Sequence, residues 1–402
     1  MYCAGGIHVL VSTTTLAAGI NTPASTVVLA ESKFVGKDGR PFTVAEYKNM
    51  AGRAGRLGFS ETGKAIMLAD TPMERAQLFQ RYVLGVPEGV KSSFHPNDLP
   101  TWTLRLLSQI RGIRADEIPT LLVNTFGGYS ASRDNPQWSA LVVPDITNLV
   151  TRLLETGLAE MDGDLMHLTL LGRACGSSSL QFESSLRLIE LSRNLDASQT
   201  PAGHMLAIIQ VLDELDDVYT PIAKKENTRP SEVMSRFGND IVRMLQRHCR
   251  DQAQLWARCK RAALLYDWIE GTSIDTLEER YSTKSFTGRV GYGDIIGMAD
   301  ATRFHLRSAH EILGALFPEQ SDFLGGLDEI LLRLEFGLPS SALPLMDIPV
   351  QLTRGQYLAL LSVGVHNIDE IKNLDNDQLC HCVGENMAAL LRSIDDSSGN
   401  TA

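Results

Sequence analysis

The sequence predicts a multidomain, mostly helical protein that begins with a small α/β portion. Up to about residue 69, short apolar and β-branched runs alternate with helical segments, as is typical of buried parallel strands. A stretch rich in Gly, Pro and Ser follows at 85–100 and indicates a linker. Beyond it, helical periodicity continues almost to the C-terminus. A chain of 402 residues has room for about two to four such domains.

The composition is that of a globular protein, with 44% apolar and 21% charged residues. The net charge of -11 argues mildly against a nucleic-acid binder, although a local basic stripe would suffice for binding. Six scattered cysteines indicate a reducing compartment. The sequence has no run of 18 apolar residues and opens on no signal peptide, so we expect a cytoplasmic or, in a nucleated cell, nuclear protein without membrane contact.

Three short runs are the expected strands, at 7–12, 27–30 and 65–69. Three strands are too few for a doubly wound sheet, so we expect part of a larger α/β domain. After the linker, helical patterns occupy 101–112, 115–124 and 144–157. A hairpin signal follows at 158–168, with its turn at Asp162-Gly163-Asp164. Three helices closed by a hairpin describe a winged helix.

The sharpest motif is Asn49-Met-Ala-Gly-Arg-Ala-Gly-Arg56. Arg53 and Arg56 are three residues apart and would share one face of a helix. The glycines between them let the backbone approach a neighbour closely. A planar guanidinium suits a phosphate better than an ammonium group does. The alternative interpretation is the solvated basic start of a helix.

A second motif runs from Val11 to Ala24, where an expected strand ends in hydroxyls. The Thr13 and Thr14 hydroxyls and nearby backbone N–H groups can hold the phosphate of a nucleic-acid strand. The alternative is ordinary capping of the next helix.

Together these motifs resemble motifs V and VI of superfamily two nucleic-acid helicases. The GINTPA and GRAGR strings are most similar to the superkiller-like branch, which includes archaeal fork-repair helicases and the helicase region of DNA polymerase theta. The resemblance implies that Arg53 and Arg56 reach the γ-phosphate of ATP, bound with Mg²⁺ on a first RecA-like lobe, and that Arg56 is the arginine finger. It further implies that Asn49, where the family normally has Gln, and Gly52 contact the nucleotide.

The same resemblance assigns roles around the second motif. Thr13 and Thr14 would contact the tracking strand, and Gly19 and Asn21 would couple the strand and nucleotide sites. Further matches follow at Leu168–Arg173 and Ala262–Gly271. The implied domains are a C-terminal portion of the second RecA-like lobe (1–95), a winged helix (96–178), a helical ratchet bundle (179–318), a helix-hairpin-helix-like domain (319–395) and a disordered tail (396–402).

Residues 294–316 would form the ratchet helix, on which Arg303, Arg307 and His310 share a face beside Phe304. A row of cations with an aromatic ring suits a single strand, because bases stack on rings while phosphates seek positive charge. Alternatively, Phe304 belongs to the core and the cations are merely solvated.

A second basic stripe suggests an amphipathic helix with a basic outer face, which either follows a phosphate backbone or is only solvated. Its members are Arg243, Arg247, Arg250, Arg258 and Arg261. In the helix-hairpin-helix-like piece, Val350 and Leu352 occupy the two positions that are normally glycine, so we expect packing or a brake-like contact there rather than strong binding of phosphate. Cys380-His381-Cys382 has no second ligand pair, and we expect no metal site.

The chain contains no P-loop string, and Asp213-Glu-Leu-Asp216 only imitates a magnesium-binding box because it lies within helical periodicity. The chain alone is therefore expected to be inactive as an ATPase, with the first lobe supplied in cis or in trans. We expect part of an ATP-dependent helicase that moves 3′ to 5′ on single-stranded or forked DNA. DNA is favoured because the large winged-helix insertion of the RNA members does not fit between 101 and 178. An RNA helicase fragment and a non-catalytic DNA-binding or adaptor module remain the alternatives.

Overall fold

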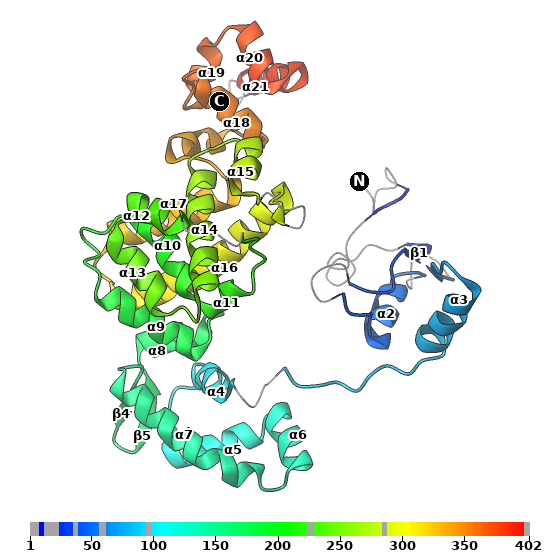
Figure 1. The fold of residues 1–402 in the computed structure, drawn as a ribbon, viewed down its shortest axis with the longest axis vertical. Coiled ribbons are helices and arrows are strands. Elements are labelled where there is room, and N and C mark those ends of the chain that lie inside the picture. Colours follow the sequence, from blue (N-terminus) through cyan, green and yellow to red (C-terminus); the bar gives the residue numbers. More distant parts are fainter. Residues whose placement is uncertain are drawn as a thin grey trace. The chain divides into compact units, whose positions relative to one another are not determined.

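The computed structural model describes residues 8–11, 24–34, 39–55, 62–93, 98–222, 228–283 and 288–397. The chain forms two compact units, residues 1–93 and 94–402 (Figure 1). Helices dominate and the sheets are small, so the predicted mostly helical, multidomain fold class is confirmed.

The first unit contains a two-stranded parallel sheet. β1 (Thr26–Leu29) pairs with β2 (Lys64–Met67), in agreement with two of the expected strands. The expected strand at 7–12 is wrong for the part of it that is described, because residues 8–11 form no strand and Val9 and Val11 are 77% and 91% exposed. A β-branched run becomes a strand only where a neighbouring strand takes up its backbone hydrogen bonds.

Helix α2 (Val44–Ala51) packs its buried face into the small core of this unit. Its N-terminus is fixed by a capping box, in which Thr43 Oγ1 accepts from the Glu46 amide and Glu46 accepts from the Thr43 amide. The Glu88 carboxylate accepts from the amides of Val44 and Ala45, at 2.8 and 3.0 Å. The unit continues with α3 (Pro72–Leu78) and the π-helical turn η1 (Phe79–Val83).

Hydrogen bonds from Arg40 to Glu46, with smaller contributions from Thr43, lower the pKa of this carboxyl to about 2. A lowered folded pKa stabilises the unit fully above the ordinary value of 4.5, and the contribution is lost as the pH falls from 4.5 towards 2. We expect Glu46→Gln to reduce the hydrogen-exchange protection of α2 at pH 6 and to have little effect near pH 2. Glu74→Gln, which changes the equivalent cap of α3, should leave α2 unchanged at both pH values. A protection loss that is the same at both pH values would contradict the assignment.

The second unit opens with helices around a three-stranded antiparallel sheet of order β3-β5-β4. The predicted hairpin is present, with Asp162 opposite Leu165 and Gly163 at a φ of 59° in the turn. The helices and strands of this first part of the second unit are α4 (Leu99–Leu107), β3 (Ile113–Arg114), α5 (Ile118–Val123), α6 (Phe126–Asp134), α7 (Trp138–Glu155), β4 (Ala159–Asp162), β5 (Leu165–Leu168) and α8 (Leu170–Ser177).

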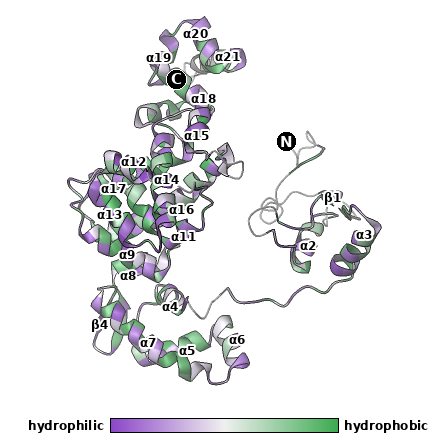
Figure 2. Ribbon diagram, viewed as in Figure 1, coloured by the Kyte–Doolittle hydropathy of each residue, from purple (hydrophilic) through white to green (hydrophobic). Residues whose placement is uncertain are grey.

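A helical bundle follows, with α14 (Gln252–Ile269) packed among most of its other helices (Figure 1). The other helices are α9 (Phe182–Arg193), α10 (Met205–Ile208), α11 (Asp213–Asp216), α12 (Arg229–Phe237), α13 (Asn239–Arg247), α15 (Ile274–Tyr281), α16 (Tyr292–Leu316) and α17 (Ser321–Phe336). Hydrophilic and hydrophobic residues are interspersed along these helices (Figure 2). No helix in the described ranges is long and apolar enough to cross a membrane.

Four short helices complete the chain around a core of their own: α18 (Arg354–Ser362), α19 (Ile368–Asn373), α20 (Asn376–Val383) and α21 (Glu385–Ser397). Leu352 belongs to this core and Val350 packs against it, so the expected packing role is confirmed. Arg354 connects the start of α18 with the end of α14. Its guanidinium lies over the Trp268 ring, 4.2 Å from the centroid, and donates to the carbonyls of Gly337, Trp268 and Thr272.

Candidate functional site

The arginine-rich motif begins within the last turn of α2, and the helix stops before its arginines. Gly52 is the C-cap, and the Arg53 and Ala54 amides donate to the carbonyls of Met50 and Ala51, at 3.2 and 3.1 Å. The expectation that Arg53 lies on a helix face is therefore wrong, because it lies in the turn beyond the last helical residue. Arg56, its expected partner, lies outside the described residues.

The conformation of this turn requires two glycines, Gly55 and Gly63. Gly55 has a φ of +71°, a left-handed conformation that side chains rarely adopt. A Cβ on Gly55 would also lie only 2.3 Å from the backbone nitrogen of Gly63. Gly55, which lies between the two arginines, therefore allows the turn after α2 to approach the backbone at Gly63 closely.

The same turn is bonded to the end of the threonine-rich motif. The Gly55 amide donates to the Ala24 carbonyl at 3.0 Å, and the Ala24 amide donates to the Arg53 carbonyl at 3.4 Å. Ala24 and Ala54 form an isolated parallel bridge. Ala24 is the last residue of the second motif, so the structure places the ends of both motifs side by side.

Asn49 and Gly52 are exposed at this end of α2, and the Arg53 side chain is half-buried. The carbonyl end of a helix by itself repels a phosphate. A nucleotide contact here therefore depends on guanidinium groups rather than on backbone amides. The other residues predicted for these two motifs lie outside the described residues, and these are Thr13, Thr14, Gly19 and Asn21.

The second candidate site is the exposed face of α16, the expected ratchet helix. Phe304 is 60% exposed and Arg307 is also exposed; residues three apart on a helix are neighbours. Arg303 lies at the flank of this face and forms ion pairs with Glu335 of α17 and, at 4.0 Å, with Asp300. The predicted row is therefore divided, with one cation beside the aromatic ring and one directed towards α17.

His310, the fourth member of that row, also turns towards α17. Its Nε2 lies 3.3 Å from Asp328 Oδ1 and 3.3 Å from the Leu324 carbonyl oxygen. Periodicity placed these cations on one face but gave no sign of the acidic residues opposite them, which come from the next helix.

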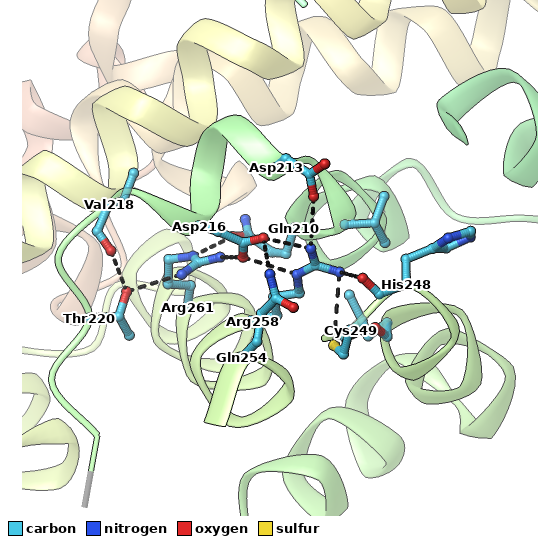
Figure 3. A network of polar contacts seen from close by, with 12 residues as sticks. Gln210, Asp213, Asp216, Val218, Thr220, His248, Cys249, Gln254, Arg258 and Arg261 are labelled. Carbon is cyan, nitrogen blue, oxygen red and sulfur yellow. Dashed lines mark hydrogen bonds and ion pairs between the residues drawn. The ribbon is translucent and has the colours of Figure 1, made fainter. Parts of the chain in front are cut away.

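The other basic stripe is not one continuous outer face. Arg243, Arg247 and Arg250 are exposed as expected, but the last two members are buried, so the prediction of a single basic face is wrong. Arg247 ends α13, a new helix begins at Gln252, and the side chains of Arg258 and Arg261 are 0% and 1% exposed. Both guanidiniums instead converge on one carboxylate, Asp216 of α11 (Figure 3). The Arg258 Nη2 to Asp216 Oδ2 distance is 2.6 Å, and the Arg261 Nη2 to Asp216 Oδ1 distance is 3.3 Å.

Burial lowers the pKa of Arg261 to about 10, against the opposing charge of Asp216, so the side chain remains protonated at neutral pH. Burial would also lower the pKa of Arg258, but its hydrogen bonds and ion pair with Asp216 outweigh burial and raise it. Arg261 Nε further donates to Gln210, whose amide nitrogen donates to Thr302 of α16 at 3.2 Å. The Asp213–Asp216 segment is thus an internal counter-ion for arginines, as its helical setting indicated, and not a magnesium box.

Over 94% of its length, the chain is similar to a Caldivirga maquilingensis protein named ATP-dependent DNA helicase Hel308, with 25% identity over 397 residues and 50% of that protein covered. A protein of the same name from Pyrobaculum calidifontis is 28% identical over 372 residues, which are 91% of this chain and 49% of the relative. The chain is thus similar to the Hel308 DNA helicases along almost its whole length. The Hel308 of Pyrococcus horikoshii is 26% identical over 390 residues. No family model matches the chain.

The Hel308 similarity confirms the resemblance to archaeal fork-repair helicases that the two motifs predicted. The chain spans about half the length of the curated relatives it matches. Because the matched share is 94%, it includes parts of both the α/β unit and the helical unit. Parts of both units are therefore matched within one and the same Hel308 relative.

Proposed function

We propose that the chain is the C-terminal part of an ATP-dependent DNA helicase, and that it supplies the second RecA-like lobe and the domains that grip a single strand. One observation carries the proposal: the similarity to Hel308 proteins runs through both units. The turn that joins Ala24 to the arginine-rich motif supports it, because strand and nucleotide motifs must be coupled in a motor. In this proposal the winged helix covers 96–178, and the ratchet bundle runs from 179 through α17 instead of ending at 318. The buried residues of α17 belong to the core shared with α14 and α16, and not to the core of the last four helices; they are Phe323, Leu327, Ile330 and Leu334. The helix-hairpin-helix-like domain then follows α17.

In this proposal Arg53 and Arg56 meet the terminal phosphate of ATP, and Arg56 stabilises the negative charge of the transition state. Asn49 and Gly52 border the nucleotide. The described residues contain no group of three His, Cys, Asp or Glu side chains that could hold a metal ion. The resemblance to superfamily two helicases is what assigns magnesium and the ATP phosphates to the first lobe, whether in the same chain or in a separate one.

The single strand is assigned to two places. Thr13 and Thr14 would contact it on the α/β unit, with Gly19 and Asn21 coupling this contact to the nucleotide. On α16, the exposed Phe304 ring offers a stacking surface and Arg307 a cation for the adjoining phosphate.

The test is strand displacement with a first RecA-like lobe supplied in cis or in trans. We expect ATP-dependent unwinding of a DNA duplex that carries a 3′ single-stranded overhang, and far less unwinding of the same duplex with a 5′ overhang. Preference for an RNA duplex would favour the RNA helicase alternative. Binding to DNA without ATP hydrolysis or unwinding would show a non-catalytic module.

A further inference from the structure

The flank of α16 that packs on α17 carries two pairs of opposite charge. Arg303 is paired with Glu335, and His310 lies beside Asp328, the two pairs being about two helical turns apart on each helix. The order of the residues shows that the helices run antiparallel. Carboxylates of α17 thus line the edge of the surface that we assign to the single strand.

Arg303 is close to the exposed members of that surface. It is four residues before Arg307, so the two guanidiniums belong to neighbouring positions on the helix. Phe304 is exposed next to it. A phosphate bound at Arg307 would therefore lie within reach of Arg303, if Arg303 were not engaged by Glu335 and Asp300.

We propose that Glu335 competes with the single strand for Arg303, and thereby keeps the grip of α16 weak enough for release. The inference rests on the proposed function, specifically on α16 as a strand-binding helix. The Glu335 side chain is 43% exposed and that of Arg303 is 25% exposed, so a phosphate can approach and replace the carboxylate. An ion pair this exposed adds little stability in water, and exchanging it for a phosphate contact changes the free energy little.

The exchange has a distinct salt dependence. A cation that contacts a phosphate releases a condensed counterion, and log K falls with log salt by about 0.7 for each such contact on a single strand. While Arg303 stays paired with Glu335 it contacts no phosphate and releases no counterion. Removing the Glu335 charge should therefore strengthen binding and also steepen its salt dependence.

The experiment measures binding of a fluorescein-labelled oligothymidylate to the full chain by anisotropy over a series of salt concentrations. We expect Glu335→Gln to bind roughly three- to tenfold more tightly at low salt, as one charge-assisted contact is gained, with a salt slope steeper by about 0.7. The matched control is Glu329→Gln, which removes one charge from the same helix. Glu329 is 39% exposed and pairs with Arg333, which keeps Glu270 as a partner at 2.6 Å. This control should stay close to the wild type.

Two further variants separate the possible results. Adding Arg303→Gln to Glu335→Gln should abolish the gain, since the released guanidinium is then absent. A gain that survives in the double variant, or equal binding by Glu335→Gln and Glu329→Gln, overturns the inference. Phe304→Ala should weaken binding about tenfold by loss of base stacking. If Phe304→Ala has no effect, or the wild type does not bind at low salt, strand binding by α16 fails and the inference falls with it.

Discussion

Arg56→Ala is expected to lower the rate of DNA-stimulated ATP hydrolysis by about 10³-fold when a first RecA-like lobe is present, because an arginine finger contributes 10³ or more to kcat. The KM for ATP should change little, since the guanidinium acts on charge that develops in the transition state. Arg56→Lys should recover only a small part of the rate, because an ammonium group cannot form the paired hydrogen bonds of a guanidinium. The rate of ATP hydrolysis of the wild type and of both variants is measured as steady-state phosphate release at saturating single-stranded DNA.

The matched control is Arg75→Ala, which removes an exposed guanidinium from α3 of the same unit. This variant should hydrolyse ATP at the wild-type rate. Equal rates for Arg56→Ala and Arg75→Ala would refute the proposed contact with the terminal phosphate. Arg53→Ala is expected to raise the KM for ATP and also to lower kcat, because Arg53 directly follows Gly52, which we propose borders the nucleotide.

The largest loss of stability is expected for Asp216→Ala. Asp216 is 16% exposed and serves Arg258 and Arg261, which have almost no contact with water. Removing this carboxylate leaves two buried guanidiniums without their shared counter-ion, and breaking a buried ion pair in this way costs about 3–5 kcal/mol. Asp213 also pairs with Arg258, at 3.5 Å, and limits the loss. Urea unfolding followed by far-UV circular dichroism reports on the helical bundle.

Asp217→Ala provides the comparison, since it removes an exposed carboxylate from the next position in the chain. It should shift the urea midpoint very little. If Asp216→Ala and Asp217→Ala unfold at the same urea concentration, the buried network does not stabilise the bundle.

Local signals in the sequence were sufficient for some elements of the fold. The hairpin at 159–168 was predictable because its turn residues and its strands are adjacent in the chain. Helix α6 was missed because Gly127 and Gly128 stand in its first turn, where glycine disfavours a helix. The Thr125 hydroxyl caps this helix by accepting from the Gly128 amide at 3.0 Å, which is the signal that would have found it.

The candidate sites were likewise predictable only where the signal is local in the sequence. The sequence motifs identified both segments that meet at Ala24 and Gly55, but not the backbone bonds that join them. Helical spacing could not show that Arg258 and Arg261 turn inwards, because their partner Asp216 lies on another helix. Nor could it show that Glu335 engages Arg303, since charge pairs between helices depend on tertiary packing. Helical spacing shows which residues share a face only where the helix is continuous, and it does not show which residues of another helix pack against that face.

The attachment of the C-terminal helices has a mechanical consequence. One Arg354 side chain both stacks on the Trp268 ring and donates to three backbone carbonyls: that of Trp268 in the last turn of α14, that of Thr272 beyond it and that of Gly337 at the end of α17. These contacts share one guanidinium, so a movement of that side chain disturbs all of them. A displacement of the start of α18 therefore acts on the ends of both α14 and α17.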